Sequence, residues 1–159
     1  MEKRSDEDKL RLLTTLNEHI AHTFQIGVTV EKVEGEELTL RLPYAENLVG
    51  DPETGVLHGG VITVLLDQTL GVSALACDAL QPSIAPTLDL RIDHLGVAPA
   101  GKDIFATASV YRTTRRVLFI RGIAYWDTPD NPIARATGTW LRLEEVDTSW
   151  AGKAERKES

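Results

Sequence analysis

The sequence predicts one α+β domain in which an antiparallel sheet curls around a single long helix. The chain has 159 residues, which is enough for one domain with a substantial core. Its one long apolar helical run covers about residues 58–77, and short alternating segments follow it. Several strand faces carry Ala and Gly, whose small side chains allow a sheet to pack closely around a helix.

The N-terminal segment is predicted to form a separate helix. Ser5 is a good N-cap, and the acidic residues 6–8 that follow it suit a first helical turn. Apolar residues then recur at helical spacing, so we expect a helix over about residues 6–22. These apolar residues are Leu10, Leu13, Leu16 and Ile20.

The other elements are predicted to be strands. A hairpin precedes the central helix, with one strand at Val28–Val30, the other at Leu38–Leu42 and the turn at Gly35. Residues 43–57 contain prolines and glycines and are predicted to be a loop. Short connections favour antiparallel hairpins for the later strands, which are predicted around residues 88–92, 104–110, 118–124 and 134–138.

These elements divide the chain into three parts. Residues 1–24 are expected to form the N-terminal helix and arm, and residues 25–146 the main domain. Residues 147–159 form a polar tail that we expect to be disordered.

Composition limits the partners and the compartment. A net charge of −7 disfavours nucleic acid, although it is compatible with a local basic site for a phosphorylated small ligand. Cys77 is the only cysteine, so no internal disulfide can form and a reducing compartment is expected. The N-terminus lacks the apolar core of a secretory signal, and Asp67 interrupts the apolar run. We therefore expect a cytoplasmic protein without membrane contact.

Asp67 is the first candidate for a catalytic residue. It is an acid inside an apolar helical run, and a buried carboxylate that faces a cleft is suited to proton chemistry. Gly59 and Gly60 lie at the expected start of the same helix, where free N–H groups can bind an anion. A carboxylate and an amide anion site on one helix indicate acyl transfer or hydrolysis.

Three segments carry a family resemblance: GVLHGGVITVLLDQTLG at 55–71, PTLDLRIDHLGVAPAGKDI at 86–104 and ARATGTW at 134–140. Together they resemble the hotdog-fold acyl-CoA thioesterases of the phenylacetate-degradation (PaaI-like) type, over about residues 25–143. The resemblance implies a sheet wrapped around the helix, dimers or dimers of dimers, and hydrolysis of acyl-CoA without a metal or another cofactor.

The resemblance also implies roles for individual residues. Asp67 corresponds to the catalytic carboxylate, and Gly60, with Gly59, to the amide that polarises the thioester carbonyl. His58 matches the histidine of the motif, and Thr87 matches a hydroxyl residue that positions water. Related sequences often carry an asparagine in the preceding loop. Here Asp51 occupies roughly that place and Asn47 is the nearest asparagine, so either could contact substrate.

The spacing between Gly60 and Asp67 favours a site shared by two subunits. Seven residues of helix place them roughly 10 Å apart along the axis. Acid and oxyanion donor must each lie within about 3 Å of the reacting groups. A two-fold partner with an antiparallel helix could place its Asp67 opposite this chain's Gly60.

Other interpretations stay open at this stage. Asp67, His58 and Thr87 could each have only a structural role. Arg115 and Arg116 occupy a predicted hairpin turn, where they could either face solvent or bind the phosphates of a nucleotide. The main alternative to an enzyme is a non-catalytic module that binds acyl-CoA. A dehydratase would need a histidine paired with the acid, and no such pair is evident in the sequence.

Overall fold

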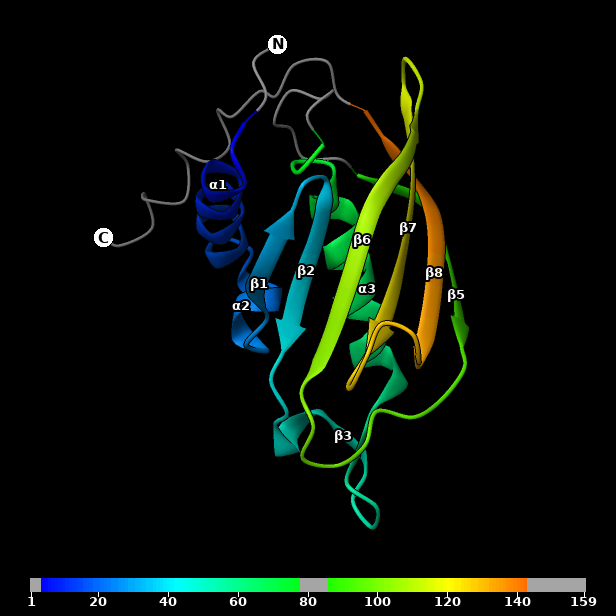
Figure 1. Cartoon of the computed structure of the whole chain (residues 1–159). Coiled ribbons are helices and arrows are strands. Elements are labelled where there is room, and N and C mark those ends of the chain that lie inside the picture. The colour runs from blue at the N-terminus through cyan, green and yellow to red at the C-terminus, as the bar shows by residue number, and fades with distance from the viewer. Residues whose placement is uncertain (1–3, 78–85, 143–159) are drawn as a thin grey trace, which may run out of the picture.

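The computed structural model describes residues 4–77 and 86–142 (Figure 1). The tail predicted at 147–159 lies outside the described residues. The helices are α1 (Asp6–Glu18), α2 (Ala21–Gln25), the 3₁₀ turn η1 (Glu46–Leu48) and α3 (Gly59–Ser73). The strands are β1 (Thr29–Glu34), β2 (Glu37–Leu42), β3 (Val49–Asp51), β4 (Val56–Leu57), β5 (Thr87–His94), β6 (Ile104–Thr113), β7 (Val117–Tyr125) and β8 (Ala134–Leu141).

The main sheet has six antiparallel strands in the order β1-β2-β6-β7-β8-β5. The strand β5, which directly precedes β6 in the chain, therefore lies at the far edge beside β8. α3 lies behind the sheet in Figure 1 and contacts β2, β5, β6, β7 and β8. This confirms the predicted antiparallel sheet wrapped around one helix. β3 and β4 form a separate two-stranded hairpin.

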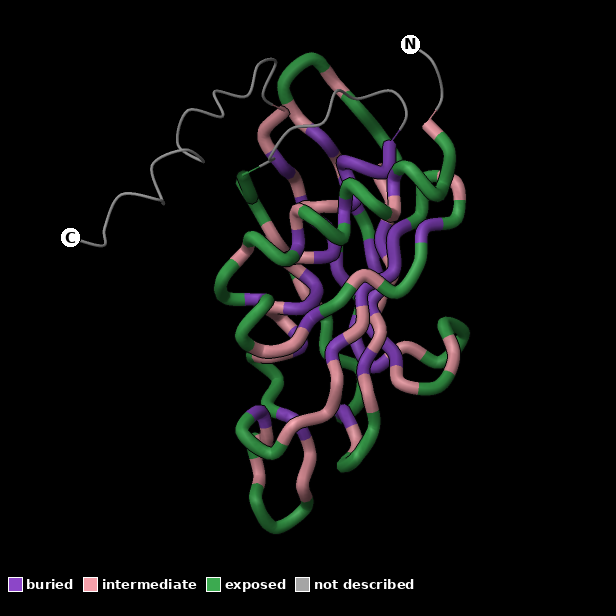
Figure 2. The backbone as a smooth tube through the Cα atoms, turned by 90° about the vertical axis from the view of Figure 1, so that its left-hand side faces the viewer, coloured by how far each residue is buried: buried purple, intermediate pink, exposed green. Residues whose placement is uncertain are grey.

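Small residues allow the sheet to approach α3. A Cβ added at Gly122 on β7 would lie 2.7 Å from Cδ1 of Leu70 and 2.9 Å from the carbonyl oxygen of Thr107. Leu65, Leu66 and Leu70 on α3 are fully buried against this inner face. Buried positions alternate with intermediate or exposed ones along most of β6 and along β8, and the tube in Figure 2 shows buried segments through the middle of the molecule. The predicted role of Ala and Gly in close packing is thus confirmed at Gly122.

The N-terminal region differs from the prediction. The single helix expected over 6–22 is two helices, because the chain at Ile20 is extended, with φ −90° and ψ 95°. Asn17, at the end of α1, is buried and donates a 2.7 Å hydrogen bond from Nδ2 to the carbonyl oxygen of Val28. This bond ties α1 to the residue before β1, so the chain turns there. The predicted Ser5 N-cap is present and accepts a hydrogen bond from the Asp8 N–H.

Two further boundaries differ. α3 ends at Ser73 and is followed by a turn, so the helix is shorter than the predicted 58–77. The loop predicted at 43–57 contains η1 and the β3–β4 hairpin. Asp103, the residue before β6, contacts the start of that loop: its carboxylate accepts hydrogen bonds from the Tyr44 N–H and from Nε of Arg41 on β2, both at 2.9 Å. These bonds hold the loop against the end of β2.

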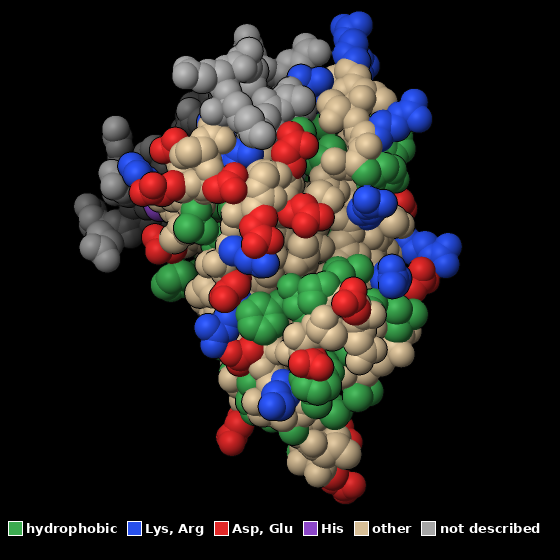
Figure 3. Space-filling model, viewed as in Figure 1, with side chains coloured by type: hydrophobic (Ala, Val, Ile, Leu, Met, Phe, Trp, Pro, Cys, Tyr) green, Lys and Arg blue, Asp and Glu red, His purple; other side chains and the backbone are tan. Residues whose placement is uncertain are grey.

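The outer face of the sheet is mixed in character. Acidic and basic side chains are interspersed with hydrophobic ones over this face in Figure 3. Phe105 and Tyr125 stack there with ring centroids 5.9 Å apart. Within the described residues, no helix has the length and apolar character needed to cross a membrane.

Candidate active site

The N-terminus of α3 is capped by the side chain of His58. Nδ1 of His58 accepts a 2.9 Å hydrogen bond from the N–H of Gly60, and the His58 carbonyl accepts one from the N–H of Val61. A Cβ at Gly60 would lie 2.8 Å from Nδ1 of His58, so only glycine leaves room for this cap. Gly60 therefore allows the close approach of an imidazole ring to the helix end.

This cap also determines the tautomer of His58. A neutral imidazole that accepts at Nδ1 carries its proton on Nε2. His58 is exposed in the single chain and lines a cavity. Nε2–H is thus available as a hydrogen-bond donor beside the start of α3.

Asp67 and Thr87 come together although 20 residues separate them in sequence. Oγ1 of Thr87, the first residue of β5, donates a 2.9 Å hydrogen bond to Oδ1 of Asp67 in the middle of α3. The prediction that Asp67 is buried is wrong for the single chain. Its side chain is half-buried, because the stripe of α3 that carries it turns away from the sheet.

Two cavities lie along this outward stripe of α3. The first, which we call the Asp67 cavity, has a volume of about 310 Å³ and is lined by Leu16, Ile20, Asp67, Gln68, Gly71, Val72, Leu75, Pro86, Thr87 and Trp140. The second, the His58 cavity, has a volume of about 440 Å³ and is lined by His22, Ile26, Asn47, Leu48, Val49, Gly50, His58, Gly60, Val61 and Val64. No residue lines both cavities, so one chain does not bring Asp67 and Gly60 to a common site.

Asn47 and Asp51, the two residues considered for contact with substrate, lie in different parts of the segment before α3. Asn47 lies in η1 and lines the His58 cavity together with His58 and Gly60. Asp51 closes the turn of the β3–β4 hairpin, where its carboxylate accepts hydrogen bonds from Oγ1 of Thr54 at 2.6 Å and from the N–H of Glu53 at 3.0 Å. These two bonds, with that from Thr54 the larger cause, lower the pKa of Asp51 below its ordinary value.

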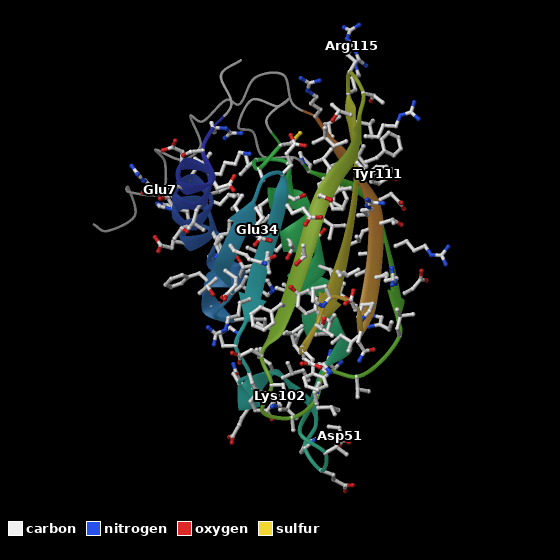
Figure 4. All side chains as sticks on the ribbon, in the orientation of Figure 1. Glu7, Glu34, Asp51, Lys102, Tyr111 and Arg115 are labelled. Atoms are coloured by element: carbon white, nitrogen blue, oxygen red, sulfur yellow. The ribbon has the colours of Figure 1, made fainter. Side chains whose placement is uncertain are left out.

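Arg115 and Arg116 lie at the tip of the β6–β7 hairpin. Figure 4 shows Arg115 and Asp51 at opposite ends of the molecule. The carbonyl of Arg116 accepts a hydrogen bond from the N–H of Arg142, which holds the hairpin to the end of β8. Within one chain, these arginines therefore lie far from the N-terminus of α3.

Gly59 is the first residue of α3. A Cβ added at Gly59 would lie 3.7 Å from Cε1 of His94, which is an ordinary contact distance.

The sequence did not reveal several residues that surround the candidate site. Leu16 and Ile20 line the Asp67 cavity from the N-terminal helices, and Trp140 lines it from β8. His22 and Ile26 reach the His58 cavity in the same way. The helical spacing of Leu16 and Ile20 indicated an apolar face, but not what that face covers. No three His, Cys, Asp or Glu side chains among the described residues are arranged to hold a metal ion.

The fold is that of a hotdog protein. A family model described as the thioesterase superfamily matches residues 54–131. The chain is 36% identical to a Halobacterium salinarum protein that is named as a candidate esterase, over 66% of this chain and 71% of that protein. This protein belongs to the thioesterase superfamily. The predicted PaaI-like resemblance is confirmed.

Other relatives have more specific names. The chain is 27% identical to the Escherichia coli K12 protein named medium/long-chain acyl-CoA thioesterase YigI, over 77% of this chain and 86% of that one. A solved structure from Pseudomonas aeruginosa is similar with a TM-score of 0.77 and 42% identity, over 85% of this chain and 99% of that chain. The structure of a mutant of the phenylacetic acid degradation protein PaaI from Thermus thermophilus is similar with a TM-score of 0.64 and 25% identity, over 77% and 99% of the two chains.

Proposed function

We propose that this protein hydrolyses acyl-CoA thioesters to the free acid and CoA. The observation that carries the proposal is the hydrogen bond between Thr87 and Asp67, which fixes a carboxylate in a cavity on the central helix. Membership of the thioesterase superfamily and the name of the E. coli relative support the reaction class. That name also supports medium or long acyl chains as the substrate class.

The active site of this proposal is shared by two subunits. Asp67 and Gly60 line separate cavities in one chain, while a reacting carbonyl needs both an activating acid and an oxyanion donor. In a two-fold dimer with antiparallel α3 helices, Asp67 of one subunit would face Gly60 of the other. Two identical sites would then form at one interface. A further pairing of dimers is compatible with this arrangement.

Catalysis begins with the thioester carbonyl bound at the start of α3. The Gly60 N–H and the His58 Nε2–H are the two donors proposed for the developing oxyanion, with the positive end of the helix dipole behind them. Because Gly60 also donates to His58 Nδ1, its N–H would either be shared or be released as the imidazole shifts. Gly59 keeps the backbone open beside these donors.

Asp67 of the opposite subunit then activates a water molecule. Oδ1 is held by Thr87, so Oδ2 would accept the proton as the water oxygen attacks the carbonyl carbon. The tetrahedral intermediate expels CoA as a thiolate, which takes up a proton, and the free acid remains. Direct attack by Asp67 through an anhydride, which water then hydrolyses, gives the same products.

The loop and hairpin residues are assigned to binding. Asn47 lies beside His58 and is proposed to contact the thioester region, whereas Asp51 is proposed to support the loop that presents Asn47. Arg115 and Arg116 lie at the end opposite the α3 N-terminus, and antiparallel pairing would bring that end towards the partner's site. We assign them to the phosphates of CoA.

A panel of acyl-CoA esters of increasing chain length, with the released thiol trapped by a chromogenic reagent, tests the proposal. Wild-type protein should release thiol from part of the panel. Asp67→Asn should lose at least about a hundredfold in kcat while keeping its fold and melting temperature. Asp93→Asn, an exposed acid paired with Arg91, is the matched control and should stay active. Binding without thiol release would instead indicate a non-catalytic acyl-CoA module.

A further inference from the structure

The Asp67 cavity has an apolar wall that comes from outside the main sheet and α3. Leu16 at the end of α1 and Ile20 at the start of α2 line it on one side. Pro86, Thr87 and Trp140 line it from the other side. In Figure 1, α1 and α2 lie beside β1, at the edge of the sheet opposite β5. The floor between these two sides is α3.

Hydrogen bonds fix this wall in place. Asn17, between Leu16 and Ile20, bonds to the Val28 carbonyl at 2.7 Å, and Oδ1 of Asn17 accepts a 3.4 Å bond from Nε2 of Gln68 on α3. Oγ1 of Thr23 bonds back to the Ile20 carbonyl at 3.1 Å. The α1–α2 junction is therefore attached both to the start of β1 and to the helix that carries Asp67.

The polarity of the two parts of acyl-CoA indicates which of them occupies the Asp67 cavity. CoA is polar and highly charged, whereas the acyl chain is apolar and gains free energy when it leaves water. Apart from Asp67, Gln68 and Thr87, the cavity lining is apolar or glycine. A volume of about 310 Å³ also matches the lower end of the range for small-molecule pockets, about 300–1,000 Å³.

We infer that the α1–α2 junction is the wall of the acyl-chain site and that Leu16 and Ile20 set the length of the chain that fits. This inference rests on the proposed function. The N-terminal helices thus act as a specificity element, in addition to covering part of the core. Asn17 and Gln68 act as positioning residues, because they fix the distance between this wall and the floor of the cavity.

Substitutions of Ile20 in both directions test the inference. Ile20 is half-buried, so a larger side chain can be accommodated by extending into the cavity. Ile20→Phe should move the preferred acyl chain to a shorter length, and Ile20→Ala should move it to a longer one. One methylene in an apolar pocket changes kcat/KM by about 10- to 200-fold, so the profile should shift by a measurable step. Thr14→Phe, on the exposed face of α1, is the matched control and should leave the profile unchanged.

Binding provides a second readout that is independent of turnover. Non-hydrolysable acyl-CoA thioethers of graded length, titrated by calorimetry, should show the same shift in preference. If Ile20→Phe does not fold, as judged by circular dichroism, Ile20→Ala and the thioethers still decide the question. Wild-type protein that hydrolyses esters but shows no shift in either Ile20 variant overturns the inference. Wild-type protein that hydrolyses none of the esters overturns the proposed function instead.

Discussion

Oγ1 of Thr87 donates a 2.9 Å hydrogen bond to Oδ1 of Asp67, and this bond joins the start of β5 to the middle of α3. It satisfies one carboxylate oxygen and sets the orientation of the other. Hydrogen bonds to charged groups contribute about 1.5–3 kcal/mol, which corresponds to about ten- to a hundredfold in rate if the contact persists in the transition state.

Thr87→Val should therefore lower kcat by about ten- to a hundredfold, because the carboxylate loses its positioning donor. Thr87→Ser keeps the hydroxyl and should retain most of the activity. Steady-state kinetics with one acyl-CoA ester compare the two variants, while thermal unfolding checks that both are folded. Equal activity of Val and Ser at this position would show that the bond plays no part in turnover.

His58 should have separable roles in helix capping and in chemistry. His58→Ala removes the cap and should cost about 0.5–2 kcal/mol of stability. His58→Asn supplies another good capping side chain, so it should keep the stability but lack the Nε2–H donor and lose activity. Chemical denaturation and kinetics on the same two variants measure both effects. An Asn variant with full activity would limit His58 to a capping role.

Mixed dimers test whether Asp67 and Gly60 act across an interface. Asp67→Asn and Gly60→Ala homodimers should both be inactive, the second because the added Cβ displaces His58. In a purified heterodimer of these two variants, one of the two sites combines an intact Asp67 with an intact Gly60. About half of the wild-type activity should return, since two-fold pairing leaves one site complete. If each chain forms its own site, the heterodimer stays inactive.

Gly122→Ala should destabilise the fold. The added methyl group would lie 2.7 Å from Leu70 and 2.9 Å from the backbone carbonyl of Thr107, and only the leucine could move. Overpacking of this kind costs about 1–3 kcal/mol. Thr137→Ala, on the outer face of the neighbouring strand β8, is the control and should change stability by less than about 0.5 kcal/mol. Urea unfolding of both variants gives the comparison.

Acid should weaken the loop before α3 through Asp103. The hydrogen bond from the Tyr44 N–H, followed by the contact with Arg41, lowers the pKa of Asp103 below its ordinary value of 3.8. A lowered pKa means that the stabilisation is complete above pH 3.8 and is lost as the pH falls through the lower folded-state value. Asp103→Asn should therefore show a smaller loss of stability between about pH 5 and about pH 2.5 than the wild type, as measured by unfolding at each pH. An identical loss in both proteins would contradict this assignment.

The sequence predicted the elements whose periodicity is strong. Alternation located the strands of the main sheet, and the apolar run located α3, because each pattern follows directly from which side chains face the core. The break at Ile20 was not predictable, since it depends on a tertiary hydrogen bond from Asn17 to Val28. Asp67 was recognisable as a lone acid, but its half-exposed position depends on which side of α3 faces the sheet.

The separation of Asp67 and Gly60 into two cavities has a practical consequence for enzymology. If neither chain holds a complete site, dilution should reduce specific activity because the dimer dissociates. Each separated chain would remain folded and chemically unchanged. Assays at nanomolar protein would then underestimate turnover. Rate plotted against protein concentration would curve upward at the low end, and a dissociation constant for the subunits could be read directly from that curve.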